Sequence, residues 1–324
     1  MNISKKIAKA SLTWAFFMVL FGCGGVTGGS SASSSSILVV EFSGHRMDST
    51  ASMTGINWFS FGSVGSGTNQ LSNPNGVATD SLGRIYIADR GNDRIVRMND
   101  GSGAGWTTFG TSGSGTGQFS SPRSVSIDSS GRIYVGDRNN TRIVRIDDMS
   151  GSGWVSFGSV GNGVNQFGGQ MFDIEFDSSN RIYISDFTND RVVRIDDMLG
   201  TGWVTIGTSG PGTSQFLGPY GLAIDSSDHI YIGDRNNRRI VRIDDMTGAG
   251  WVTFGVPGSG VGEFGTISGI TVDKQSNQIY IAEEGNNRIT RMNDMTGAGW
   301  VSFGTSGSGV NQFKLPAGIT LRKN

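Results

Sequence analysis

The chain has 324 residues, of which 52 are Gly and only six are Pro, and its formal net charge is −1. Glycine at roughly twice its usual frequency excludes a helical bundle, because each Gly inside a helix costs about 1 kcal/mol. The supply of apolar and aromatic residues argues against disorder, so we expect a turn-rich, all-β fold. Two His residues are too few for a three-His zinc site within one chain.

The first 23 residues have the pattern of an export signal. Three lysines precede an apolar run over residues 12–21, which is shorter than the roughly 20 residues that cross a bilayer. The run ends in Leu20-Phe21-Gly22-Cys23, which resembles the lipobox of bacterial lipoproteins. The resemblance implies a lipoprotein signal peptide over residues 1–22 and a lipid on Cys23, the only Cys of the chain. The alternative is an ordinary signal peptide in which the Cys occurs by chance.

The next segment predicts a tether. Residues 23–36 comprise the lipidated Cys and a Gly/Ser-rich stretch, which as a coil would reach about 20 Å. We therefore expect an exported bacterial lipoprotein in the cell envelope. The resemblance favours the outer membrane, because Gly24 stands where an Asp would favour retention in the inner membrane.

A repeat of 48 or 49 residues follows the tether. It is marked by Trp58, Trp106, Trp154, Trp203, Trp251 and Trp300. Each interior repeat contains four short β-like runs, for example 76–80, 84–89, 94–99 and 105–110, separated by turn residues. Four short strands per repeat are typical of an antiparallel propeller blade.

The order of the runs predicts how the ring closes. The innermost run occurs six times and for the last time at 318–322, whereas the N-terminal repeat starts with the second run at Ile37. The last run would therefore supply the missing inner strand of the N-terminal blade. The predicted fold is an all-β, six-bladed β-propeller over residues 37–324 that leaves no open sheet edge.

The second and third runs carry a specific motif. The segments IYIADRGNDRIVR, IYVGDRNNTRIVR, IYISDFTNDRVVR and IYIGDRNNRRIVR resemble the NHL repeat. The resemblance covers roughly residues 37–322 and implies a six-bladed β-propeller that serves mainly as a binding platform. Members of this family include RNA-binding and ligase-associated modules, bacterial sensor ectodomains and amidating lyases.

Residues that recur in every repeat are interpreted as structural. An acid ends the second run and an Arg follows five residues later, as in Asp89 and Arg94. Because a catalytic site would occur once, we expect these residues to form a ring of ion pairs. The repeated Trp and Tyr are expected to pack between blades.

Positions that depart from the repeat are the candidate site. Blades expose two sets of loops on one face, here called the top face. Just after the acid, the candidate binding residues are Arg90, Arg138, Phe187, Arg235 and Glu284, with Phe42 at the matching place. Arg and aromatic residues are favoured anchors of interfaces, and the alternative is a set of solvated loop tips.

The second set of loops leads to the mouth of the central channel. Its candidate residues are Asn75, Arg123, Phe172, Asp173, Glu175 and Tyr220. The two carboxylates replace residues that are small or uncharged in the other repeats, and we expect Arg123 to be their partner. The cluster is either a neutralising arrangement or a polar site. Asp173 and Glu175, with the oxygen of Asn75, are weak candidates for Ca²⁺ or Mg²⁺, and no other cofactor is predicted.

These features favour a binding module over an enzyme. The expected function is a membrane-tethered, monomeric and non-catalytic propeller whose top face binds an envelope protein, peptide or glycan. The alternative is a propeller hydrolase or lyase with a divalent metal at the channel mouth, although no catalytic residue is assigned. Without the three lysines of residues 1–23, 23 basic residues remain against 27 acidic ones, a net charge of about −4 that disfavours nucleic acid.

Overall fold

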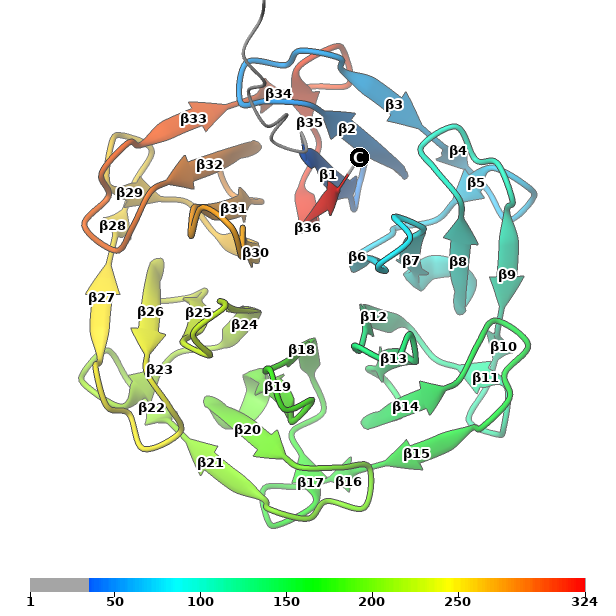
Figure 1. Ribbon diagram of the computed structural model, residues 1–324, viewed down its shortest axis with the longest axis horizontal. Coiled ribbons are helices and arrows are strands. Elements are labelled where there is room, and N and C mark those ends of the chain that lie inside the picture. Colours follow the sequence, from blue (N-terminus) through cyan, green and yellow to red (C-terminus); the bar gives the residue numbers. More distant parts are fainter. Residues whose placement is uncertain (1–34, 324) are drawn as a thin grey trace, which may run out of the picture. The chain divides into compact units, whose positions relative to one another are not determined.

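The computed structural model describes residues 35–323, which form a ring of six four-stranded antiparallel blades (Figure 1). The prediction of a six-bladed β-propeller is confirmed. From the channel outward, blade 1 contains β36 (Pro316–Lys323), β1 (Ser35–Glu41), β2 (Arg46–Thr50) and β3 (Phe59–Phe61). Blade 2 contains β6 (Val77–Thr79), β7 (Ile85–Asp89), β8 (Arg94–Met98) and β9 (Thr107–Phe109). Blade 3 contains β12 (Pro122–Ile127), β13 (Ile133–Asp137), β14 (Arg142–Ile146) and β15 (Val155–Phe157).

The other three blades repeat this order. Blade 4 contains β18 (Met171–Phe176), β19 (Ile182–Asp186), β20 (Arg191–Ile195) and β21 (Val204–Ile206). Blade 5 contains β24 (Pro219–Ile224), β25 (Ile230–Asp234), β26 (Arg239–Ile243) and β27 (Val252–Phe254). Blade 6 contains β30 (Ile267–Val272), β31 (Ile279–Glu283), β32 (Arg288–Met292) and β33 (Val301–Phe303). Two short 3-10 helices, η1 (Arg90–Asn92) and η2 (Phe187–Asn189), follow β7 and β19.

Small parallel strand pairs, which the sequence did not predict, stand on the rim between successive blades. They are β4 (Ser63–Val64) with β5 (Gln70–Leu71), β10 (Thr111–Ser112) with β11 (Gln118–Phe119), β16 (Ser159–Val160) with β17 (Gln166–Phe167), β22 (Thr208–Ser209) with β23 (Gln215–Phe216), β28 (Val256–Pro257) with β29 (Glu263–Phe264), and β34 (Thr305–Ser306) with β35 (Gln312–Phe313). Each pair turns a glycine-rich loop into an ordered link. In one such loop, the Gln118 side chain accepts a hydrogen bond of 3.0 Å from the Gly115 amide.

The ring closes as the repeat order predicts. β36 pairs with β1 in antiparallel register from Ser35↔Lys323 to Glu41↔Pro316. β1 begins at Ser35, two residues before the predicted start of the propeller, because the C-terminal strand is long enough to pair with them.

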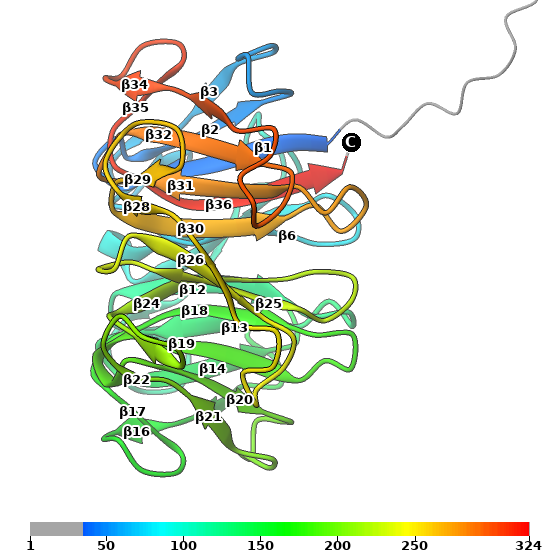
Figure 2. The ribbon, with the colours of Figure 1, turned by 90° about the vertical axis from the view of Figure 1, so that its left-hand side faces the viewer.

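The register also defines the two ends of the ring. At the top face the inner strands begin and the second strands end, as where Pro122 lies opposite Asp137. At the other end, the bottom face, β1 begins at Ser35 and β36 ends at Lys323. Figure 2 shows that β36 ends on one side of the ring, and the top face lies on the opposite side.

The core lies between neighbouring blades. Each hydrophobic cluster joins residues of two successive blades, as where Tyr134 and Ile143 of blade 3 pack with Ile182 and Val193 of blade 4. The repeated Trp covers this core from the outside, because the Trp154 ring centroid lies 5.5 Å from that of the fully buried Phe119. The expected packing role of Trp and Tyr is confirmed.

A ring of buried ion pairs joins the second and third strands at the top ends of the blades. Its members are Asp89–Arg94, Asp137–Arg142, Asp186–Arg191, Asp234–Arg239 and Glu283–Arg288, at 2.7–2.9 Å. Blade 1 supplies a sixth pair, Glu41–Arg46 at 2.9 Å. The acids are fully buried, and their Arg partners donate further hydrogen bonds to the rim loops. These repeated charges therefore stabilise the fold.

Candidate functional site

Arginines from different blades gather around one aromatic ring at the top mouth of the channel. The guanidinium carbon of Arg235 lies 4.7 Å from the Tyr220 ring centroid, and that of Arg123 lies 5.4 Å from it. Phe187 meets the same ring edge-on with a centroid distance of 6.3 Å. Tyr220 is only 5 % exposed, so its ring supports the two guanidinium groups from beneath.

Two more arginines complete this group, which we call the arginine cluster: Arg90, Arg123, Arg138 and Arg235. The guanidinium carbon of Arg90 lies 5.0 Å from the centroid of the half-buried Phe42 ring. Burial lowers the pKa of Arg90, and the charge of Arg138 lowers it further. Burial is also the main reason why the pKa of Arg123 falls to about 10, with added repulsion from the other three arginines. The four charges are therefore close enough to repel one another.

Few acids balance this charge. Arg235 forms an ion pair of 2.7 Å with Glu284 and donates a hydrogen bond of 3.1 Å to the Ile267 carbonyl. Arg90 and Arg138 form no ion pair with any residue among 35–323, although Arg138 donates to the Asn139 side chain at 3.1 Å. Positive charge is therefore concentrated at the top mouth of a chain whose overall charge is slightly negative.

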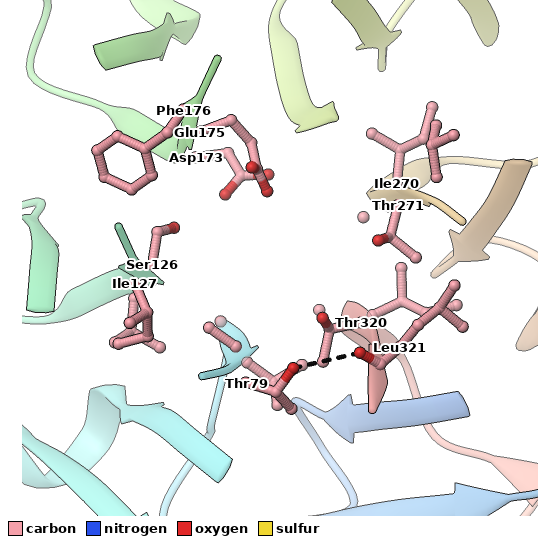
Figure 3. A pocket seen from close by; sticks show the side chains of 18 of the residues that line it. Thr79, Ser126, Ile127, Asp173, Glu175, Phe176, Ile270, Thr271, Thr320 and Leu321 are labelled. Atoms are coloured by element: carbon pink, nitrogen blue, oxygen red, sulfur yellow. Dashed lines mark hydrogen bonds between the residues drawn. The ribbon is translucent and has the colours of Figure 1, made fainter. Parts of the chain in front are cut away.

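The central channel holds a cavity of about 270 Å³ below the cluster. Asn75, Arg123 and Tyr220 line its top, and Lys274 and Lys323 line its bottom. Figure 3 shows the carboxyl groups of Asp173 and Glu175 pointing into the cavity, together with several hydroxyl groups.

Asp173 is partnered by backbone amides, which corrects the expectation that Arg123 is its partner. The Asp173 carboxylate accepts hydrogen bonds from the amides of Ile174 at 3.0 Å and Leu222 at 2.9 Å. The Arg123 guanidinium lies over the Tyr220 ring. Since Leu222 belongs to the next blade, Asp173 links two blades at a place where the other inner strands carry Gly or, in blade 3, Ser124.

The two carboxyl groups in the cavity hold their protons strongly. Burial raises the pKa of Asp173 well above its ordinary value, and the charge of Glu175 raises it further. Burial also raises the pKa of Glu175 to about 7, although the charge of Lys274 opposes the shift. A carboxyl group that titrates near neutral pH inside a channel is suited to moving protons.

A divalent metal does not fit these residues well. Within residues 35–323, no group of three or more His, Cys, Asp or Glu side chains could hold a metal ion. Both oxygens of Asp173 already accept backbone hydrogen bonds, so Glu175 and neutral hydroxyl groups would remain as ligands. Calcium takes six to eight oxygen ligands, usually with several carboxylates.

The remaining predicted site residues lie at the following places. Asn75 is buried at the top of the cavity, where its backbone N–H donates a hydrogen bond of 3.1 Å to the Ala88 carbonyl. Phe172 belongs to β18. Cys23, the signal peptide and most of the tether lie outside the described residues. The sequence analysis did not predict the ion pair between Arg235 and Glu284. The two residues occupy the same loop position in neighbouring blades, so alignment of the repeats could have indicated it.

Comparison with known families agrees with this architecture. The NHL repeat model matches residues 71–98 and 119–146, and a family model described as a 6-bladed beta-propeller matches residues 221–297. The chain is a six-bladed β-propeller in which two segments match the NHL repeat. Comparison of this NHL propeller with curated protein sequences gives no match. Within the described residues, no helix has the length and apolar character that a membrane crossing requires.

Solved structures share the fold of the NHL propeller at low sequence identity. A chain from a nidogen/laminin complex has a TM-score of 0.67 at 17% identity, covering 89% of this chain and 98% of its own. A protein of unknown function from Bacteroides caccae has a TM-score of 0.61 at 14% identity, covering 90% and 100%. Virginiamycin B lyase from Staphylococcus aureus has a TM-score of 0.58 at 15% identity, covering 89% and 88%. At these identities the likeness concerns the fold alone.

Proposed function

We propose that the NHL propeller is a non-catalytic binding module of the bacterial cell envelope. It is tethered through a lipid on Cys23, and its top face binds an envelope protein, peptide or glycan. The observation that carries the proposal is the arginine cluster. Arg123 and Arg235 lie over the Tyr220 ring, and Arg90 lies over Phe42. One acid, Glu284, is ion-paired with the cluster. Arginines stacked on aromatic rings are frequent anchors of protein interfaces.

The placement of the first strand supports this function. β1 starts at Ser35 on the bottom face, so any tether before it joins the ring at the end opposite the arginine cluster. An anchored propeller would therefore keep its binding face accessible.

Capture from cross-linked envelopes tests the binding role. The full-length chain is compared with a triple variant, Arg90→Gln, Arg138→Gln and Arg235→Gln. The matched control replaces three half-buried arginines near the bottom face, Arg97, Arg145 and Arg194, by Gln. We expect a partner that the wild type and the control capture and the triple variant loses, with similar melting temperatures for all three. A partner captured equally by the triple variant, or no partner at all, contradicts the proposal.

Localisation is tested separately. Cys23→Ser removes the proposed lipidation site, and we expect the chain to leave the membrane fraction while its binding is unchanged. Retention of the variant in that fraction would refute the lipid anchor.

A second candidate function, a hydrolase or lyase, is favoured by one observation. Glu175 has a pKa of about 7 in the channel cavity, which suits a general acid or base. Its test is turnover of a panel of lactones and esters by the full chain, with Glu175→Gln as the inactive variant. Elemental analysis of the purified chain determines whether a divalent metal is bound. If none is found, activity that depends on Glu175 would have to arise without a metal.

A further inference from the structure

We infer that the arginine cluster binds the carboxylates of an acidic peptide segment. The inference rests on the proposed function and specifies the ligand of that site. It starts from the position of three guanidinium groups, those of Arg90, Arg123 and Arg235, whose central carbons lie 4.7–5.4 Å from the centroid of an aromatic ring. A stacked guanidinium still has its N–H donors in the plane of the group, and two of these donors match the two oxygens of a carboxylate.

The chain itself supplies an example of this recognition. The Arg235 guanidinium lies over Tyr220 and at the same time holds the Glu284 carboxylate at 2.7 Å. Arg90 has the same kind of support, since it lies over Phe42, but no described acid forms an ion pair with it. A carboxylate of a partner at Arg90 would reproduce the arrangement that Glu284 forms with Arg235, and the nearby charge of Arg138 would add to the attraction.

The aromatic rings argue against a glycan or a nucleic acid. Sugars and bases bind by stacking on open aromatic faces. Tyr220 is 5 % exposed and is contacted by two guanidinium groups and by Phe187, so it has little face to offer. The accessible chemistry of the cluster is therefore that of the guanidinium edges.

The charge distribution argues for a compact acidic segment. The chain beyond residue 23 has 23 basic and 27 acidic residues, so a long polyanion that extends past the cluster would meet repulsion. The carboxyl groups of Asp173 and Glu175 lie deeper in the cavity and would keep an anionic group at the mouth. A short run of Asp or Glu in an extended peptide meets both conditions.

The test is calorimetric titration of the full-length chain with hexaglutamate, with hexaglutamine as the uncharged control. At 50 mM salt, we expect hexaglutamate to bind at least tenfold more tightly than hexaglutamine and to weaken at 300 mM salt. The double variant Arg90→Gln and Arg138→Gln should lose at least tenfold in affinity. The double variant Arg97→Gln and Arg145→Gln, which carries the same charge change near the bottom face, should stay within twofold of the wild type.

A further variant distinguishes ligand recognition from a merely structural role. Glu284→Gln removes the internal carboxylate and exposes Arg235, so we expect it to bind hexaglutamate several-fold more tightly than the wild type. Equal binding of hexaglutamate and hexaglutamine would overturn the inference. Tighter binding of octauridine RNA or of trigalacturonate than of hexaglutamate would overturn it as well.

The outcome separates this inference from the proposed function. If the arginine-dependent capture of an envelope partner succeeds and hexaglutamate fails, the ligand class is wrong and the binding module stands. If hexaglutamate binds and no envelope partner is captured, the site is correct and the envelope function is wrong.

Discussion

Replacing Glu175 by Gln tests how much stability the protein loses when this buried carboxyl group ionises. Burial raises the pKa of Glu175 from 4.5 to about 7 in the folded protein. A raised pKa means that this group contributes full stability below pH 4.5 and that the contribution is lost as the pH rises through 7. The difference of 4.5 against about 7 corresponds to about 3 kcal/mol, since one pKa unit is about 1.4 kcal/mol.

Gln cannot ionise, so Glu175→Gln removes the loss of stability that the wild type shows as the pH rises. We expect the two proteins to have similar free energies of unfolding at pH 4 and the variant to be more stable by about 3 kcal/mol at pH 8. Urea unfolding followed by tryptophan fluorescence between pH 4 and pH 9 measures both values. The difference between the two proteins isolates Glu175 from other titrating groups. A difference that does not change with pH, or that favours the wild type at pH 8, would refute the reasoning.

Further predictions concern the fold. Burial and the charge of Asp48 raise the pKa of Glu41 to about 9, although its partner Arg46 opposes the shift. Glu41→Gln should therefore be more stable than the wild type at pH 9 and similar to it at pH 4 by urea unfolding. A Cβ on Gly269 would lie 2.7 Å from the Ala317 carbonyl oxygen, so Gly269→Ala should lower the free energy of unfolding by about 1–3 kcal/mol. Asp137→Ala leaves the half-buried Arg142 without its carboxylate and should cost about 3 kcal/mol in the same assay. Deletion of residues 316–324 removes the inner strand of blade 1, and circular dichroism should show loss of the cooperative melting transition.

The sequence predicted most of the fold because the information is repeated. A Trp every 48 or 49 residues and four short runs between successive copies are visible without any structure. The position of Ile37 in the second run was enough to predict the β1–β36 closure. The rim strands were not predicted because loops such as residues 110–117 are too short and too rich in Gly to show an alternating pattern.

The sequence predicted which residues form the candidate site, but it did not predict which groups these residues contact. The departures at Arg123, Asp173 and Tyr220 were visible against the repeat. The backbone amide of Leu222, which bonds Asp173, carries no side-chain signal, since every residue except Pro offers the same donor. The sequence therefore pointed to an Arg as the partner of the carboxylate, whereas the fold supplied a neighbouring strand.

The closure of the ring has a mechanical consequence. A chain held before Ser35 and bound at the top face would be pulled from one face of the ring toward the other, which is the direction in which β1 runs from Ser35 to Glu41. β1 is paired with β36 on one side through seven residues and with β2 on the other through five. A pull along the strand loads these hydrogen bonds together in shear, whereas a pull across the sheet would break them one after another. The pairing of the terminal strands therefore orients the hydrogen bonds of the first blade so that they resist such a pull together.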